Sequence, residues 1–203
     1  MINKFYTPYN RFWHWTQMLM VILLSVTGWE IHGTYKFFGY QAAVSIHNAA
    51  AWGFIILTIF SMFWMALTGE WKQYLPTMNK MGAQIKFYLS GIFYGEPHPV
   101  LKSRHRKLNP LQRMVYFLIL MITIPFQIIT GLIYMYFHLA KNAIGIEYMR
   151  DTAILHTIGA FLLIAFLLVH VYLVTTGHTV WSNIKAMFTG YEKSEEHAEL
   201  EHQ

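Results

Sequence analysis

Four histidines lie inside apolar stretches of this chain, and they are the residues best suited to chemistry. The segment 154–173 carries two of them, fourteen residues apart, among Leu, Ile, Val and Phe. Ionisable side chains are costly in an apolar layer, so their presence there indicates function. A neutral imidazole can bind a metal, and a titrating one can relay a proton. The four candidates are His14, His47, His156 and His170.

Long apolar runs must position these histidines. The chain has 203 residues, of which 55% are hydrophobic and 12% are charged, which is more apolar than an ordinary soluble domain. A helix needs about 20 residues to cross a bilayer. The sequence therefore predicts an all-α integral membrane protein, a single domain over 1–203 built as a bundle of four transmembrane helices. The four runs lie near residues 12–31, 43–67, 114–137 and 153–176.

The distribution of Lys and Arg predicts the orientation. Twelve of the fifteen basic residues precede the first run, follow the last run or lie between the second and third, and three lie in the other two connections. The positive-inside rule therefore predicts cytoplasmic termini, a cytoplasmic loop over 70–113 and an acidic cytoplasmic tail over 191–203. This bias accounts for most of the net charge of +5, so we expect lipid headgroups and not nucleic acid as partners.

Helical geometry sorts the four histidines into two levels. Fourteen residues at about 100° each bring His156 and His170 to one face of a helix, roughly 21 Å apart along its axis. In the predicted topology His156 lies near the outer surface, at the depth of His47. His170 lies near the inner surface, at the depth of His14. Each level therefore holds two imidazoles.

Two imidazoles at one depth are best explained by a b-type haem, which takes one neutral histidine on each axial side. The sequence thus predicts two haem b groups. A zinc site would gather three or four ligands at one level, usually with carboxylate or Cys among them. Cysteine is absent, which excludes thiolate iron–sulfur clusters and covalently attached c-type haem from this chain. A non-haem transporter that uses the histidines as a relay is an alternative; it needs acidic partners inside the spans, and we expect none there.

A faint internal repeat accompanies the histidines. "SVTGW" near the end of the first run echoes "IITGL" near the end of the third. Glycines in the predicted spans could let a macrocycle approach the backbone, or they could serve close packing between helices. The candidate glycines are Gly28, Gly53, Gly131 and Gly159.

The ordered motifs carry a resemblance to a known family. They are "RFWHW" and "VTGW" in the first run, "IH" at the start of the second, "LNPLQR" before the third, and "H-x13-HVY" followed by "MFTGY". This set resembles the prokaryotic cytochrome b561 superfamily, and most of all the di-haem cytochrome b subunits of nickel–iron hydrogenases, formate dehydrogenases and thiosulfate reductases. The resemblance implies an outer haem held by His47 and His156 and an inner haem held by His14 and His170.

The resemblance also implies a function. Such subunits carry electrons between a periplasmic iron–sulfur or catalytic redox subunit and the quinone pool, menaquinone or ubiquinone. It implies a quinone site near His170 and Asn109, with Gln112 as a neighbour. Asn109 and Pro110 would also be explained by a helix start, with Asn109 as the N-cap. A stand-alone cytochrome b561 oxidoreductase, moving electrons from a small donor such as superoxide to quinone, is a further alternative.

Overall fold

The structure, a computed structural model, describes residues 2–100, 107–137, 145–177 and 179–193. The described residues are mostly helical, and the strands among them form one two-stranded sheet. The prediction of an all-α protein is therefore confirmed.

The chain divides into two compact units, which are described separately. The first, called here the histidine unit, consists of Phe12–Trp64 and Ile122–Tyr172 and contains all four candidate histidines. The second, called the terminal unit, consists of Met1–Arg11, Met65–Met121 and Leu173–Gln203.

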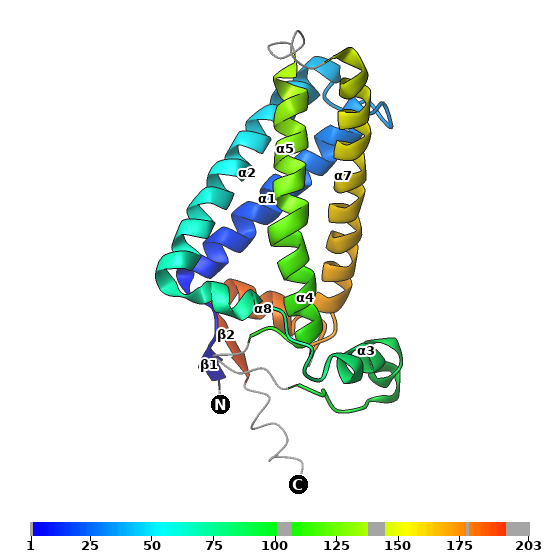
Figure 1. Ribbon diagram of the computed structural model, residues 1–203. Coiled ribbons are helices and arrows are strands. Elements are labelled where there is room, and N and C mark those ends of the chain that lie inside the picture. The colour runs from blue at the N-terminus through cyan, green and yellow to red at the C-terminus, as the bar shows by residue number, and fades with distance from the viewer. Residues whose placement is uncertain (1, 101–106, 138–144, 178, 194–203) are drawn as a thin grey trace. The chain divides into compact units, whose positions relative to one another are not determined.

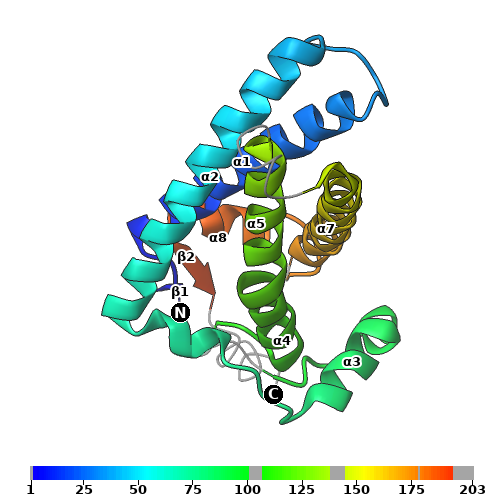
Figure 2. The same ribbon diagram turned by 45° about the horizontal axis from the view of Figure 1, so that its top comes forward.

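The histidine unit is built from parts of four long helices. In Figures 1 and 2, the part of α5 in this unit runs between those of α2 and α7. The helices are α1 (Pro8–Ile31), α2 (Tyr40–Thr68), α5 (Ile124–Met135) and α7 (Ile146–Val174).

Among the described residues, three helices are long and apolar enough to cross a membrane: Tyr40–Thr68, Pro110–Met135 and Tyr148–Val174. The first predicted run also forms a helix, the 24-residue α1. However, α1 is not one of the three, since polar residues such as His14 and Gln17 lower its mean hydropathy. The structure thus supports three of the four predicted spans by length and composition.

The span Pro110–Met135 changes its helical form along its length. It begins with α4 (Pro110–Leu118), continues as a π-helical turn over Ile119–Thr123 and becomes α5. Pro125 is the second residue after the turn, and it has no backbone N–H for the carbonyl one turn before it. A π-helical turn at such a position accommodates the missing donor.

The connection between α1 and α2 is held by a buried carboxylate. Glu30 is 4% exposed, and its oxygens accept the backbone N–H groups of Phe37 and Gly39, both at 2.7 Å, and of Phe38 at 3.0 Å. Gly39 has a φ of 85°, which favours glycine at this turn. The start of α2, which carries His47, is therefore fixed to the end of α1.

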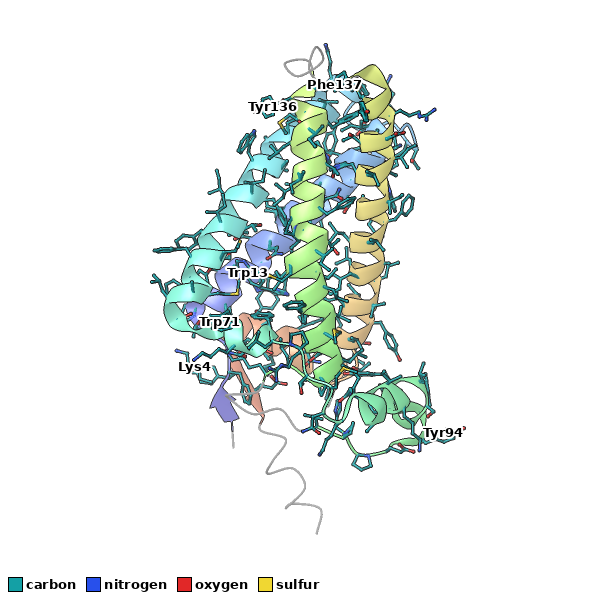
Figure 3. The ribbon with its side chains drawn as sticks, viewed as in Figure 1. Lys4, Trp13, Trp71, Tyr94, Tyr136 and Phe137 are labelled. Atoms are coloured by element: carbon teal, nitrogen blue, oxygen red, sulfur yellow. The ribbon has the colours of Figure 1, made fainter. Side chains whose placement is uncertain are left out.

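The predicted cytoplasmic loop over 70–113 is largely structured. It contains a 3-10 helix at Glu70–Tyr74, α3 (Met81–Leu89), a second 3-10 helix at Gly91–Tyr94 and the start of α4. A prediction from apolar run length missed α3, because its nine residues bury only a short face, with Gln84 fully buried. Tyr94, labelled in Figure 3, is 82% exposed. Most of "KSRHRK" lies outside the described residues.

The two ends of the described chain meet within the terminal unit. β1 (Ile2–Lys4) pairs antiparallel with β2 (Tyr191–Lys193). Between α7 and β2 lies α8 (Ser182–Thr189), where the carbonyl of Phe188 accepts a hydrogen bond of 2.6 Å from the guanidinium of Arg11. The first residues of the predicted acidic tail therefore form a strand, and 194–203 lie outside the described residues.

Candidate functional site

The four histidines form two close pairs inside the histidine unit. The ring centroids of His14 on α1 and His170 on α7 are 6.1 Å apart, and those of His47 on α2 and His156 on α7 are 6.4 Å apart. All four side chains are half-buried. The structure thus brings together the residues that were predicted to lie at the same depth. Each pair comes from two helices.

The spacing within each pair fits two axial ligands on opposite sides of a haem iron. Metal–nitrogen bonds to imidazole are about 2 Å long, so two rings that bind one ion from opposite sides have centroids about 6 Å apart. The observed 6.1 and 6.4 Å agree with this value. Among the described residues, no group of three or more His, Cys, Asp or Glu side chains is placed to hold a metal ion. The pairs therefore suit a cofactor that supplies the remaining ligands itself.

We call His47 and His156 the outer pair and His14 and His170 the inner pair, after their predicted depths. Each histidine of the outer pair is hydrogen-bonded through Nδ1 to a buried threonine. The Nδ1 of His47 lies 2.9 Å from Oγ1 of Thr27, and the Nδ1 of His156 lies 3.0 Å from Oγ1 of Thr130. Thr27 is fully buried, and Thr130 is 6% exposed. Both imidazoles are therefore oriented with Nδ1 toward a helix backbone and Nε2 on the other side of the ring.

The glycines that follow these threonines make room for the same rings. A Cβ atom on Gly28 would lie 3.4 Å from Cε1 of His47, and one on Gly131 would lie 3.0 Å from Cε1 of His156. The "TG" repeat thus has a physical reason that the sequence did not show. Its threonine binds the ring nitrogen, and its glycine leaves space for the ring edge.

Gln127 on α5 contacts Nε2 of His156. Its amide nitrogen lies 3.2 Å from Nε2 of the imidazole, while its amide oxygen is buried with no hydrogen-bond partner among the described residues. A buried amide oxygen without a partner is unfavourable. Gln127 is therefore a further polar residue of the site, next to the pair formed by His47 and His156.

The inner pair has a different surrounding. The Nδ1 of His14 is buried, and no hydrogen-bond partner reaches it from the described residues. Trp15 meets the His14 ring edge to face at 5.2 Å, and Phe166 stacks on His170 at 5.8 Å. Trp13, labelled in Figure 3, precedes His14 on α1. Aromatic contacts are thus prominent around the inner pair, whereas hydroxyl groups orient the outer one.

The polar residues that the resemblance links to quinone belong to the terminal unit and form a helix cap. Asn109 is 6% exposed; its amide oxygen accepts from the backbone N–H of Gln112 at 2.8 Å, and its backbone N–H donates to the Gln112 side chain at 3.1 Å. The Asn109 amide nitrogen donates to the hydroxyl of Tyr88 at 2.9 Å. This reciprocal cap begins α4, with Pro110 in the first turn. The helix-start interpretation is therefore observed, and the quinone role remains a prediction.

Sequence reasoning missed three functional candidates and one structural anchor in the histidine unit. The repeated "TG" was a signal for Thr27 and Thr130, whereas Gln127 gave none beyond its polarity in an apolar run. Glu30 corrects the expectation that the predicted spans hold no acidic side chain, because it lies within the run 12–31. Three backbone N–H groups already engage its carboxylate, so it is a structural anchor and not an obvious relay group.

Comparisons with known proteins identify the family of this chain. The sequence model of the family described as prokaryotic cytochrome b561 matches residues 6–190. YdhU of Escherichia coli (strain K12), whose name describes it as a candidate cytochrome, is 29% identical over 198 residues, covering 93% of this chain and 74% of that protein. No solved structure matches the chain significantly. The chain therefore belongs to the prokaryotic cytochrome b561 family and is a membrane electron-transfer protein.

Proposed function

We propose that the protein is a di-haem b-type cytochrome subunit that transfers electrons across the membrane, between a redox subunit on the outer side and the quinone pool. One observation carries the proposal. Two pairs of half-buried imidazoles, with centroids 6.1 and 6.4 Å apart, lie in one compact unit built from apolar helices. Membership of a cytochrome family that binds haem b supports it.

The residues of this chain would hold and orient the cofactors. His47 and His156 would bind the outer haem, and His14 and His170 would bind the inner haem. When bound, haem supplies reversible one-electron chemistry at its iron. The aromatic rings around the inner pair and the buried threonines at the outer pair would fix the imidazoles and set how strongly each nitrogen donates to iron.

The proposed topology places both termini in the cytoplasm and uses α1 as a fourth span. At 1.5 Å per residue, the 24 residues of α1 are about 36 Å long, which exceeds a bilayer core of about 30 Å. Two of its polar residues have partners, because His14 pairs with His170 and Glu30 binds the following loop. The excess of Lys and Arg in the termini and the 70–113 segment supports this orientation in the bacterial inner membrane.

The proposed electron partner on the outer side is an iron–sulfur or catalytic redox subunit. This chain has no Cys, so it cannot hold an iron–sulfur cluster through thiolates itself. The proposed partner on the inner side is menaquinone or ubiquinone, near the N-terminus of α4, where Asn109 presents a buried amide. The protein would thus be the quinone-reactive subunit of a respiratory oxidoreductase.

Purification of the full chain from its native membrane in mild detergent tests the assignment. We expect a reducible b-type absorption spectrum, a co-purifying subunit with redox centres, and reduction of the haem by a menaquinol or ubiquinol analogue. Recovery of the chain as a homo-oligomer that is fully active toward a small donor such as superoxide would instead identify a stand-alone oxidoreductase. A colourless protein after expression with sufficient haem would overturn both.

A further inference from the structure

We propose that Thr27 and Thr130 are positioning residues that set the tautomer of His47 and His156, so that both imidazoles present a bare Nε2 to the outer haem iron and the reduction potential of that haem is lowered. This inference rests on the proposed function, in which His47 and His156 share one haem.

The hydroxyl protons of both threonines are already committed. Thr27 donates to the carbonyl of Leu23 at 2.6 Å, and Thr130 donates to the carbonyl of Phe126 at 2.9 Å. A carbonyl oxygen only accepts, so each hydroxyl proton points along its own helix toward the residue four positions before it. The hydroxyl oxygen is left as an acceptor on its other side.

The imidazole nitrogens next to these oxygens must therefore donate. The Nδ1 atoms of His47 and His156 lie at 2.9 and 3.0 Å from the hydroxyl oxygens, within hydrogen-bond distance. A neutral imidazole carries one proton, so an Nδ1–H leaves Nε2 with a free lone pair. Both outer histidines are thus held in the tautomer that binds a metal through Nε2.

One further contact agrees with this tautomer for His156. The side-chain amide of Gln127 approaches Nε2 of His156 through its nitrogen, which only donates. For His156, the oxygen of Thr130 therefore faces Nδ1, and the amide donor of Gln127 faces Nε2.

The hydrogen bond also affects the electronics of the ligand. A ligating imidazole that donates its second N–H to an acceptor becomes more basic, and a more basic ligand stabilises the oxidised iron more than the reduced iron. Since Nδ1 of His14 has no hydrogen-bond partner among the described residues, the inner pair lacks this arrangement on at least that ligand. We therefore expect the two threonines to lower the potential of the outer haem selectively.

The test is an optical redox titration of the full haem-loaded chain with Thr27→Val and Thr130→Val, singly and together. Valine keeps the branched shape and removes the hydroxyl. At a fixed ambient potential near the midpoint, each single change should lower the ferric-to-ferrous ratio of the outer haem about threefold. The double change should lower it about tenfold, which for a one-electron couple is a rise of ~59 mV in midpoint potential. The inner haem should not move. Thr58→Val is the matched control, because Thr58 donates to the carbonyl of Phe54 at 2.8 Å in the same way and no bond from it to a histidine is seen.

Serine variants keep the test decisive if a valine variant loses its haem. Thr27→Ser and Thr130→Ser retain the hydroxyl and should keep the wild-type potential and haem content. Serine variants that behave like the valine variants would contradict the proposal, as would an outer-haem shift no larger than that of Thr58→Val or an equal shift of both haems. A wild-type chain that shows no two titrating haems would instead overturn the proposed function itself.

Discussion

The imidazole of His156 packs against Gly131 so closely that a Cβ atom there would come within 3.0 Å of its Cε1 atom. The corresponding distance between Gly28 and His47 is 3.4 Å, which is ordinary van der Waals contact. The two copies of the "TG" repeat therefore have the same arrangement, but there is more room for a Cβ atom at Gly28 than at Gly131.

This difference predicts unequal effects of alanine at the two glycines. Gly131→Ala should displace the His156 ring by a few tenths of an ångström and reduce the outer haem content of the purified chain. Gly28→Ala should retain nearly full haem content. Haem per chain in the two variants, measured after identical expression, checks the expectation. Equal loss in both would show that the glycines serve helix packing in general.

The pairing of the histidines predicts which variants lose the same haem. His47→Ala or His156→Ala should remove the outer haem, and His14→Ala or His170→Ala should remove the inner one, because one axial ligand does not hold a b-type haem of this kind firmly. His32→Ala is the control, since His32 is exposed and hydrogen-bonds to Thr157 at 2.9 Å without joining a pair.

Redox titration of the four variants identifies the haem that each retains. Variants of one pair should leave the same remaining component, and the other pair should leave the other component. If the His47 and His170 variants lost the same haem, the assignment of ligands would be wrong, but the described fold would not be contradicted.

The buried carboxylate of Glu30 predicts a stability effect without a spectral one. Glu30→Gln replaces a charged acceptor of three backbone N–H groups by a neutral amide, which should lower the free energy of unfolding. Asp151→Asn is the control, because Asp151 forms an exposed ion pair with Arg150. The Asp151 side chain is 60% exposed and the Arg150 side chain is 83% exposed, and such pairs contribute little to stability. Thermal unfolding followed by circular dichroism compares the two; an equal effect would mean that the loop anchor is unimportant.

Asn109 allows capping to be separated from quinone chemistry. Asn109→Ser keeps a good N-cap but removes the amide donor, whereas Asn109→Leu removes both. Both variants should retain normal haem spectra and exchange electrons with a quinone analogue about tenfold more slowly, as loss of about 1.4 kcal/mol of binding to the reacting state would do. Only the leucine variant should also be less stable, by about 1 kcal/mol. Normal quinone kinetics in the serine variant would leave Asn109 with its capping role alone.

The sequence was informative where helical periodicity controls the outcome. His156 and His170 share a face because four turns of helix nearly close after fourteen residues, and the partners on α1 and α2 could be predicted from depth alone. The close pairs at 6.1 and 6.4 Å are the spatial result of that pattern. Their role as haem ligands is a proposal that measurements on the protein must decide.

The sequence was uninformative about contacts that depend on a single side chain and about contacts between residues far apart in the chain. A threonine inside an apolar helix usually bonds its own backbone, so the repeated "TG" drew attention to Thr27 and Thr130 without showing that they contact an imidazole. The pairing of β1 with β2 joins residues near opposite ends of the chain and has no periodic signature in such short strands. The short helix α3 was not predicted either, because its nine residues bury only a short face.

The number of haem b groups per chain is the measurement that tests the central claim most directly. Pyridine haemochrome analysis of the purified wild-type protein, combined with quantitative amino-acid analysis, gives this ratio without any assumption about partner or quinone. Two imidazole pairs predict two haem b groups per chain, resolved as two components in a redox titration. A ratio of one would mean that one of the pairs is not an axial ligand set, and a ratio of zero would contradict the account as a whole.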